Sequence, residues 1–280
     1  MVPAAARVGE GPVWDEERSL LYWVDIVAGL LHTSDPATGS TSRLAVPTML
    51  GAAVLRTGND GFAAATTEGF AEISRDGTLT TRCPILRPGH RMNDAKCDPL
   101  GRLWAGSTEM GFQPGAGALH VLEADFSTRV VLDGLTLPNG MGWSPNSRIY
   151  YLADTIEREI SAFDVDLDTL ALSGRRLLHR FPPDGGMPDG LCVDAEGCLW
   201  VAIWGGARLE RISPDGELLR SIEMPIQQPS SCAFGGPGLT SLYITSAREG
   251  LDLSPDATDG SVFVIDDLGV VGLTVALFAG

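Results

Sequence analysis

Short apolar and aromatic runs recur along the chain, and each follows a segment that contains Asp, Asn, Gly or Pro. Such runs favour β-strands, because aromatic and β-branched side chains pack well on a pleated surface, and the residues ahead of them favour turns. Alignment of the runs places one large side chain at an equivalent position in each, and this position recurs every 40 to 49 residues. The equivalent residues are Tyr22, Phe62, Trp104, Tyr151, Trp200 and Tyr243.

The repeated units are DEERSLLYWVD (15–25), NDGFAAAT (59–66), DPLGRLWAGS (98–107), SPNSRIYYLAD (144–154), DAEGCLWVAIW (194–204) and GPGLTSLYITSA (236–247). Between them lie further strand-like segments with turns at 75–77 and 214–216, where a Gly supplies the positive φ that the turn needs. Apolar residues are not spaced by three and four over any long segment, so the pattern does not predict helices.

A repeat of about 40 to 50 residues in an all-strand chain matches one four-stranded blade of a propeller. We therefore predict an all-β fold, a six-bladed β-propeller that residues 1–280 form as a single domain. An open β-sandwich would not explain six evenly spaced units. We expect the last strands at 261–265 and 274–278, and we expect strands from the two ends of the chain to pair and close the ring.

Charge and composition restrict the partners of the protein. The net charge of −16 argues against nucleic acid, since phosphates are bound by clustered Lys and Arg, whereas this chain has Lys96 as its single lysine. No apolar run reaches the roughly 18 residues of a membrane span, and residues 1–8 do not resemble a signal peptide. The five cysteines include no C-x-x-C pair, so we expect free thiols in a reducing cytoplasm. Closed propellers are often monomers, and we expect a monomer here.

Four polar clusters lie at the same phase of the repeat, about ten residues ahead of the strongly apolar strands. They are GEGPVW (9–14), RMND (91–94), LPNG (137–140) and MPDG (187–190). Equivalent positions in successive blades face the same axis, so Glu10, Asn93, Asn139 and Asp189 should converge there. Any one of these clusters alone reads better as an ordinary turn, but four at one phase favour a site.

Two carboxylates and two amide carbonyls form a ligand set of hard oxygen atoms only. Such a set suits one divalent metal ion in a central metal-containing channel. Ca²⁺ is the ion that we expect first, and Mg²⁺, Mn²⁺ and Zn²⁺ are the alternatives. Water or substrate would occupy the remaining coordination positions.

The chain resembles the SMP-30/gluconolactonase/luciferin-regenerating-enzyme family, which includes regucalcin-like proteins and sugar lactonases. The resemblance covers nearly the whole chain, through GEGPVW, RMNDAKCDPLGRLWAGS, LPNGMGWSPN, PDGLCVDAEGCLWVAIWGG and SSCAFGGPGLTSLYITSAREG in this order. It implies that Glu10, Asn139 and Asp189 bind the metal.

The resemblance also implies which residues bind substrate. Asn93 matches an asparagine that borders the metal and contacts the ligand, and Arg91 matches an arginine that holds substrate oxygens. Glu109 lies where some members place a substrate-contacting glutamate, in a segment that varies within the family. Trp204 would either wall the pocket or pack in the core.

The function that the resemblance implies is metal-dependent hydrolysis of a small lactone, such as a sugar aldonolactone, to its sugar acid. The metal would polarise the carbonyl and stabilise the oxyanion. Asp189 would act as the catalytic general base, although a metal-bound carboxylate is a weak base, and Asp94 is the alternative. Arg91 would hydrogen-bond the substrate through its planar guanidinium.

Other functions remain open at this point. An organophosphatase, or a hydrolase of apolar lactones, could use the same site, and so could a non-catalytic calcium-binding propeller. Serine-hydrolase chemistry finds no support, because the chain has no G-x-S-x-G segment. His90 is interpreted as a loop residue at the rim of the pocket. Lys96 is expected to support the segment around Asn93 or to pair with a carboxylate.

Overall fold

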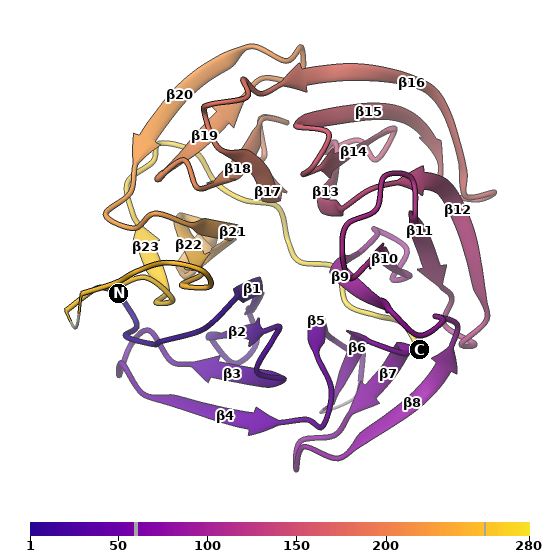
Figure 1. Ribbon diagram of the computed structural model, residues 1–280, viewed down its shortest axis with the longest axis horizontal. Coiled ribbons are helices and arrows are strands. Elements are labelled where there is room, and N and C mark those ends of the chain that lie inside the picture. Colours follow the sequence, from indigo (N-terminus) through magenta and orange to yellow (C-terminus); the bar gives the residue numbers. More distant parts are fainter. Residues whose placement is uncertain (59–60, 255) are drawn as a thin grey trace.

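Six antiparallel sheets surround a common axis in the computed structural model, which describes residues 1–58, 61–254 and 256–280 (Figure 1). Each sheet is one blade, and its strands follow one another in chain order from the axis outward. The prediction of an all-β, six-bladed propeller is confirmed. The only helix in the described residues is the short 3₁₀ turn η1, Pro237–Leu239.

The blades contain the following strands. Blade 1 has β1 (Gly9–Asp15), β2 (Leu20–Asp25), β3 (Leu30–Ser34) and β4 (Thr41–Ala45). Blade 2 has β5 (Leu50–Leu55), β6 (Phe62–Thr66), β7 (Gly69–Ile73) and β8 (Leu79–Pro84). Blade 3 has β9 (His90–Cys97), β10 (Leu103–Glu109), β11 (Gly117–Leu122) and β12 (Thr128–Leu135). Blade 4 has β13 (Pro138–Trp143), β14 (Ile149–Asp154), β15 (Glu159–Asp166) and β16 (Ala171–Arg180). Blade 5 has β17 (Met187–Val193), β18 (Leu199–Trp204), β19 (Arg208–Ile212) and β20 (Leu218–Glu223). Blade 6 has β21 (Pro229–Gly235), β22 (Ser241–Ser246) and β23 (Phe263–Ile265).

Each apolar-aromatic run of the sequence forms the second strand of a blade, and in blades 1, 3 and 5 a carboxylate accepts backbone hydrogen bonds in the turn ahead of it. Asp98 accepts a hydrogen bond from the indole nitrogen of Trp104 at 2.9 Å, and Asp194 accepts one from Trp200 at 3.0 Å. The other oxygen of each carboxylate accepts backbone N–H groups of its own turn. Aspartate is favoured in turns because its side chain hydrogen-bonds the backbone two residues on. The unit expected at 59–66 begins with Asn59 and Asp60, which lie outside the described residues.

The ring closes through the N-terminal segment. Val2 forms an antiparallel bridge with Val262, next to β23, and Val8 forms one with Ala247. These contacts complete blade 6, as the prediction of closure between the two ends required. The expected strand at 274–278 is wrong: this segment forms only an isolated bridge between Phe278 and Arg56. It instead crosses the middle of the ring, where its yellow ribbon is visible in Figure 1.

The hydrophobic core lies between neighbouring blades. Tyr22 of blade 1 packs edge to face on Phe62 of blade 2, with ring centroids 5.0 Å apart. Trp104 of blade 3 packs in the same way on Trp143 of blade 4, at 5.5 Å. Full burial of such an aromatic side chain contributes roughly 1.5–3 kcal/mol. These inter-blade contacts hold the innermost strands at fixed positions around the axis.

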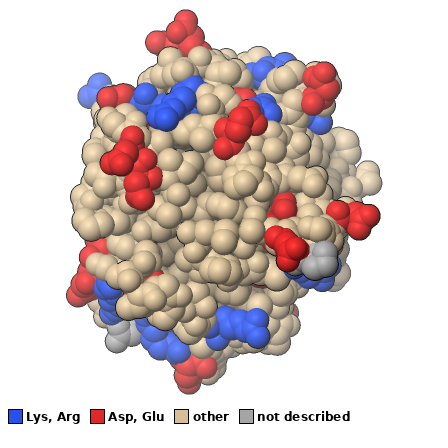
Figure 2. All heavy atoms as spheres, turned by 90° about the vertical axis from the view of Figure 1, so that its left-hand side faces the viewer, with Lys and Arg blue, Asp and Glu red and all other residues tan. Residues whose placement is uncertain are grey.

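Charged groups lie mainly at the periphery of the molecule. On the side shown in Figure 2, acidic and basic side chains form small separate groups around a broad uncharged middle. The excess of negative charge is therefore not gathered into one acidic patch on this side. Within the described residues, no helix has the length and apolar character needed to cross a membrane.

Candidate metal and active site

The innermost strand of every blade carries a β-bulge, and these bulges position the polar residues of the channel. Register shifts of one residue occur in β1, β5, β9, β13, β17 and β21. These six strands also contact one another in a closed ring. A bulge changes the direction in which the neighbouring side chains point, and bulges are frequent next to active sites. Glu10, Asn93, Asn139 and Asp189 lie at or beside four of them, and all four side chains are buried.

The polar clusters are therefore strand segments and not turns. Gly140 follows Asn139, and a Cβ at Gly140 would lie 2.5 Å from the carbonyl oxygen of Asp189. Gly190 follows Asp189, and a Cβ there would collide with the side chain of Ser231. Neither glycine has a positive φ. These glycines allow neighbouring innermost strands to approach closely, which brings the ligand positions together.

Asn139 and Asp189 are in direct contact. The side-chain nitrogen of Asn139 donates hydrogen bonds to Oδ1 of Asp189 and, at 3.1 Å, to the hydroxyl of Thr155. The side-chain oxygen Oδ1 of Asn139 is buried and has no hydrogen-bond partner. A buried carbonyl oxygen without a partner costs free energy, which a ligand with positive charge would recover.

Glu10 adds a second buried carboxylate to this group. Its Oε2 accepts a hydrogen bond from the backbone nitrogen of Gly11 at 2.7 Å. Burial raises the pKa of Glu10 well above its ordinary value, and the charges of Asp189 and Asp94 raise it further. Burial likewise raises the pKa of Asp189, again with a contribution from Asp94. The charged forms of these acids are therefore destabilised in the absence of a compensating cation.

Arg91 and Asn93 form one hydrogen-bonded unit at the start of β9. The guanidinium Nη1 of Arg91 donates to Oδ1 of Asn93 at 2.6 Å and to the carbonyl oxygen of Met92 at 3.0 Å. The amide nitrogen of Asn93 donates to the carbonyl oxygen of Pro138 at 3.1 Å. Burial lowers the pKa of Arg91, while the carboxylates of Glu10 and Asp189 raise it. The positive charge of Arg91 in turn lowers the pKa of both acids, and the hydrogen bond to Asn93 orients the guanidinium.

Asp94 is a third buried carboxylate, one residue beyond Asn93. Its Oδ1 accepts the backbone N–H of Ala95 at 2.8 Å, and burial raises its pKa although the charge of Lys96 lowers it. Lys96 extends from β9 to blade 5, where its ammonium group donates to the carbonyl oxygen of Leu191 at 2.7 Å. Lys96 therefore links blades 3 and 5 through a backbone carbonyl, whereas the sequence predicts support of the segment around Asn93 or a pair with a carboxylate.

The donor set fits a hard divalent cation. It consists of two buried carboxylates, Glu10 and Asp189, and the unpartnered carbonyl oxygen of Asn139. The part of the chain that the structure describes contains no group of three or more His, Cys, Asp and Glu side chains placed to hold a metal. An amide oxygen is thus needed as the third ligand, which is typical of calcium and magnesium sites and not of zinc–thiolate sites.

The remaining residues that the sequence singled out lie near the ends of the strands. Glu109, at the end of β10, accepts hydrogen bonds from the backbone nitrogens of Gly111 at 2.8 Å and Gln113 at 3.3 Å, so its carboxylate caps its own loop. His90, interpreted as a loop residue, is instead the first residue of β9 and is buried. Its Nε2 accepts a hydrogen bond from Arg87 at 3.3 Å. Trp204 ends β18 and is half-buried. The substrate contact of Glu109 stays a prediction.

Sequence reasoning missed Thr155 as a partner of Asn139. Thr155 directly follows Asp154, the last residue of β14. The carboxylate of Asp154 accepts hydrogen bonds from the backbone nitrogens of Thr136 and Leu137 at 2.8 and 2.9 Å. The segment LADT carried a weak signal, because Thr155 begins the connection after a buried strand and functional residues are frequent in such connections.

A comparison with protein families matches a model described as the SMP-30/Gluconolactonase/LRE-like region to residues 8–248. The chain belongs to this family. The resemblance inferred from the sequence motifs is thus confirmed.

Relatives within the family carry more than one name. Regucalcin of Xenopus laevis is 34% identical over 292 residues, which cover 100% of this chain and 97% of the relative. A 6-deoxy-6-sulfogluconolactonase of Pseudomonas putida is 37% identical over 280 residues, covering 98% and 95%. The solved structure of a regucalcin from Agrobacterium tumefaciens, described as a calcium-binding protein, superposes with a TM-score of 0.91 at 28% identity and covers 99% of this chain and 95% of that one. The family thus includes a sugar lactonase and proteins named for calcium.

Proposed function

We propose that the protein hydrolyses a sugar lactone to the corresponding sugar acid and that Glu10, Asn139 and Asp189 hold the required divalent cation. The observation that carries this proposal is the pairing of two buried carboxylates with the unpartnered carbonyl oxygen of Asn139. The sulfogluconolactonase relative supports lactone hydrolysis, and the structure described as a calcium-binding protein supports Ca²⁺ as the first ion to test.

A bound cation would act as a Lewis acid toward the lactone carbonyl. Arg91 supplies the positive, planar donor that holds the polar groups of the substrate, and its hydrogen bond to Asn93 fixes its direction. A hydroxylated substrate is favoured over an apolar one because an apolar ring would cover this half-buried guanidinium without offering it a further acceptor.

Asp189 is the proposed general base. The carboxylate takes a proton from a water molecule as the water oxygen attacks the carbonyl carbon. The same proton then passes to the ring oxygen as the ring C–O bond breaks, which yields the free acid and a hydroxyl group. The hydrogen bond from Asn139 holds the carboxylate in one orientation for both transfers. Asp94 is the alternative base, and its Oδ1 is already bound by the backbone of Ala95.

The proposal is tested with a panel of aldonolactones, including gluconolactone, xylonolactone and arabinolactone, followed by proton release. The protein is stripped of metal and then supplied with Ca²⁺, Mn²⁺, Mg²⁺ or Zn²⁺. We expect metal-dependent hydrolysis that Asp189→Asn abolishes and that Asp215→Asn, in an exposed turn, leaves intact.

Two outcomes would replace the proposal. Tight Ca²⁺ binding without turnover of any lactone would assign a non-catalytic calcium-binding role to the same residues. Hydrolysis of a phosphotriester or an apolar lactone, with sugar lactones untouched, would keep the site and change the substrate class. Turnover by Asp189→Asn at the native rate with each metal would exclude Asp189 as the base.

A further inference from the structure

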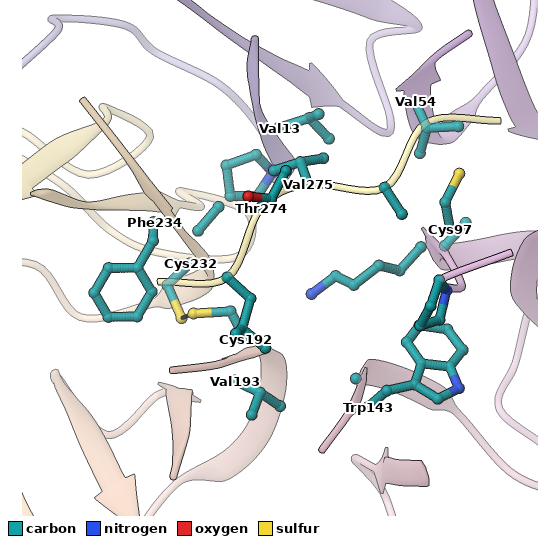
Figure 3. Close-up of a pocket in the computed structure, with 18 of the residues that line it drawn as sticks. Val13, Val54, Cys97, Trp143, Cys192, Val193, Cys232, Phe234, Thr274 and Val275 are labelled. Carbon is teal, nitrogen blue, oxygen red and sulfur yellow. Dashed lines mark hydrogen bonds between the residues drawn. The ribbon is translucent and has the colours of Figure 1, made fainter. Parts of the chain in front are cut away.

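A cavity of about 450 Å³ is lined by residues of the innermost strands and of the C-terminal segment (Figure 3). In the four innermost strands that carry Glu10, Asn93, Asn139 and Asp189, the residues that line the cavity follow these positions along the chain, such as Asp94 to Cys97 after Asn93. The C-terminal segment passes over it with Thr274 and Val275. This cavity therefore lies beyond the ligand positions along the strands, and Asp94 is the lining residue next to the position of Asn93.

Two free thiols face each other in the wall of this cavity. Cys192 of β17 and Cys232 of β21 belong to blades 5 and 6, and their Sγ atoms are 3.6 Å apart. Both residues line the cavity, and Figure 3 shows their sulfur atoms side by side. Cys97 also lines the cavity but lies on its other side in this view, away from the pair.

The surroundings distinguish the two sulfur atoms. Cys232 is 2% exposed and also contacts the carbonyl oxygen of Trp200, to which its thiol can donate at 3.2 Å. Its hydrogen bond with Cys192 and its burial raise the pKa of Cys232 well above the ordinary value, and the charge of Lys96 lowers it. Cys192 is 8% exposed and directly follows Leu191, whose carbonyl oxygen holds the Lys96 ammonium group. Cys192 is therefore the more exposed of the two residues, and it is the sulfur that a small oxidant in the cavity reaches first.

We propose that Cys192 and Cys232 are a redox modification site, in which a small hydroperoxide that enters the cavity oxidises them to a reversible disulfide between blades 5 and 6. The Cys192 thiolate attacks the outer peroxide oxygen, the O–O bond breaks, and an alcohol or water leaves after taking up a proton. Cys192 is then a sulfenic acid. Cys232 attacks its sulfur, loses a proton, and the sulfenic oxygen leaves as water.

The electrons and protons of this reaction balance. Two thiols lose two electrons and two protons, and the hydroperoxide is reduced by the same two electrons. The sulfur atoms must approach by about 1.5 Å to reach the 2.05 Å of a disulfide bond, which requires small shifts of two side chains on adjoining strands. A dithiol reductant reverses the reaction by thiol–disulfide exchange.

The test treats the reduced, folded protein with hydrogen peroxide, denatures it, alkylates the remaining thiols and maps them by mass spectrometry. We expect labels on Cys83, Cys97 and Cys198 and a linked Cys192–Cys232 peptide pair that dithiothreitol releases. The link should form at least tenfold faster in the folded protein than in urea, because the fold holds the two sulfur atoms together.

Variants supply the controls. Cys97→Ala removes a thiol from the same cavity and should leave the link unchanged, whereas Cys192→Ala should leave Cys232 open to alkylation. The proposal is overturned if both cysteines stay alkylatable under peroxide that oxidises glutathione in the same tube, or if they reach sulfonic acid without a linked peptide. The native protein alone decides between these outcomes, so failure of a variant to fold does not affect the result. Because the assay follows thiol oxidation and not lactone turnover, its outcome is independent of the proposed function.

Discussion

The side-chain nitrogen of Asn139 donates a hydrogen bond to Oδ1 of Asp189, and this contact joins blade 4 to blade 5 at the channel. The amide orientation that makes this bond turns the carbonyl oxygen of Asn139 into a buried position without a partner. The same contact thus orients the proposed base and leaves a free ligand atom beside it. Both effects follow from one choice of amide rotamer.

Asp189→Asn should stabilise the metal-free protein and destroy its response to metal. Burial and the charge of Asp94 raise the pKa of Asp189, so the charged carboxylate is less stable in the folded state than in the unfolded chain. When the pKa of a carboxyl group is raised by folding, the protein loses stability as the pH rises above the pKa that the group has in the unfolded chain. The neutral amide of asparagine does not ionise, so the variant avoids this loss of stability. We expect a higher melting temperature than the native protein in EDTA, and a lower one in Ca²⁺, because only the native protein gains from binding. An Asp189→Asn variant that melts below the native protein in EDTA would contradict this account of the site.

Thr155→Val should weaken cation binding although Thr155 is not a proposed ligand. Its hydroxyl accepts a hydrogen bond from Asn139 at 3.1 Å and so helps to fix the amide. Loss of such an outer partner typically costs about 10- to 100-fold in metal affinity. Titration calorimetry with Ca²⁺ measures the change, and Thr155→Ser, which keeps the hydroxyl, is the matched control. Equal affinities for the Val and Ser variants would mean that Thr155 does not position Asn139.

The blades were predictable from the sequence because a turn followed by an apolar-aromatic run recurs along the chain. The turn aspartates and the apolar runs recur in DPLGRLW and DAEGCLW, and the structure gives Trp104 and Trp200 the same bond to Asp98 and Asp194. The turns expected at 75–77 and 214–216 also have their Gly at positive φ, 87° in both cases. Local signals of this kind act within one segment and need no knowledge of its neighbours.

The site was less predictable, because its geometry depends on contacts between blades. Asn139-Gly140 and Asp189-Gly190 have the composition of turns, yet their glycines serve the close approach of strands that are about 40 to 50 residues apart in the chain. The segment 274–278 has the composition of a strand, but the end of blade 6 is already paired with Val2. Register and edge pairing are properties of two segments together, so one segment alone cannot show them.

Lys96→Met should destabilise the fold through one lost hydrogen bond across the ring. The ammonium group of Lys96 donates to the carbonyl oxygen of Leu191 at 2.7 Å and so ties β9 to β17. Hydrogen bonds of charged groups contribute about 1.5–3 kcal/mol, and the carbonyl would lose its donor. We expect a loss of this size in the free energy of unfolding by urea. Arg148→Met, which removes an exposed cation, should change it by less than about 0.5 kcal/mol. Similar losses for both variants would show that charge, and not the bond to Leu191, is responsible.

His120→Gln should make the stability of the protein less sensitive to acid. His120 is buried against Ser107, with Nε2 and Oγ 2.9 Å apart, and burial lowers its pKa from 6.5 to about 4. Below pH 6.5 the unfolded chain takes up a proton that the folded protein refuses, so this histidine lowers stability as the pH falls from 6.5 to about 4 and adds nothing further below that. A shift of this size corresponds to about 3 kcal/mol. Urea unfolding at pH 7, 5.5 and 4 should therefore show a smaller decline for His120→Gln than for the native protein, by up to about 3 kcal/mol. The acidic groups of the channel contribute equally to both proteins and cancel in the difference.

His32 in blade 1 has the same lowered pKa of about 4, so His32→Gln should reduce the decline independently, and the double variant should show the sum of the two effects. Parallel declines for the native protein and the His120→Gln variant would mean that His120 becomes protonated without unfolding the protein.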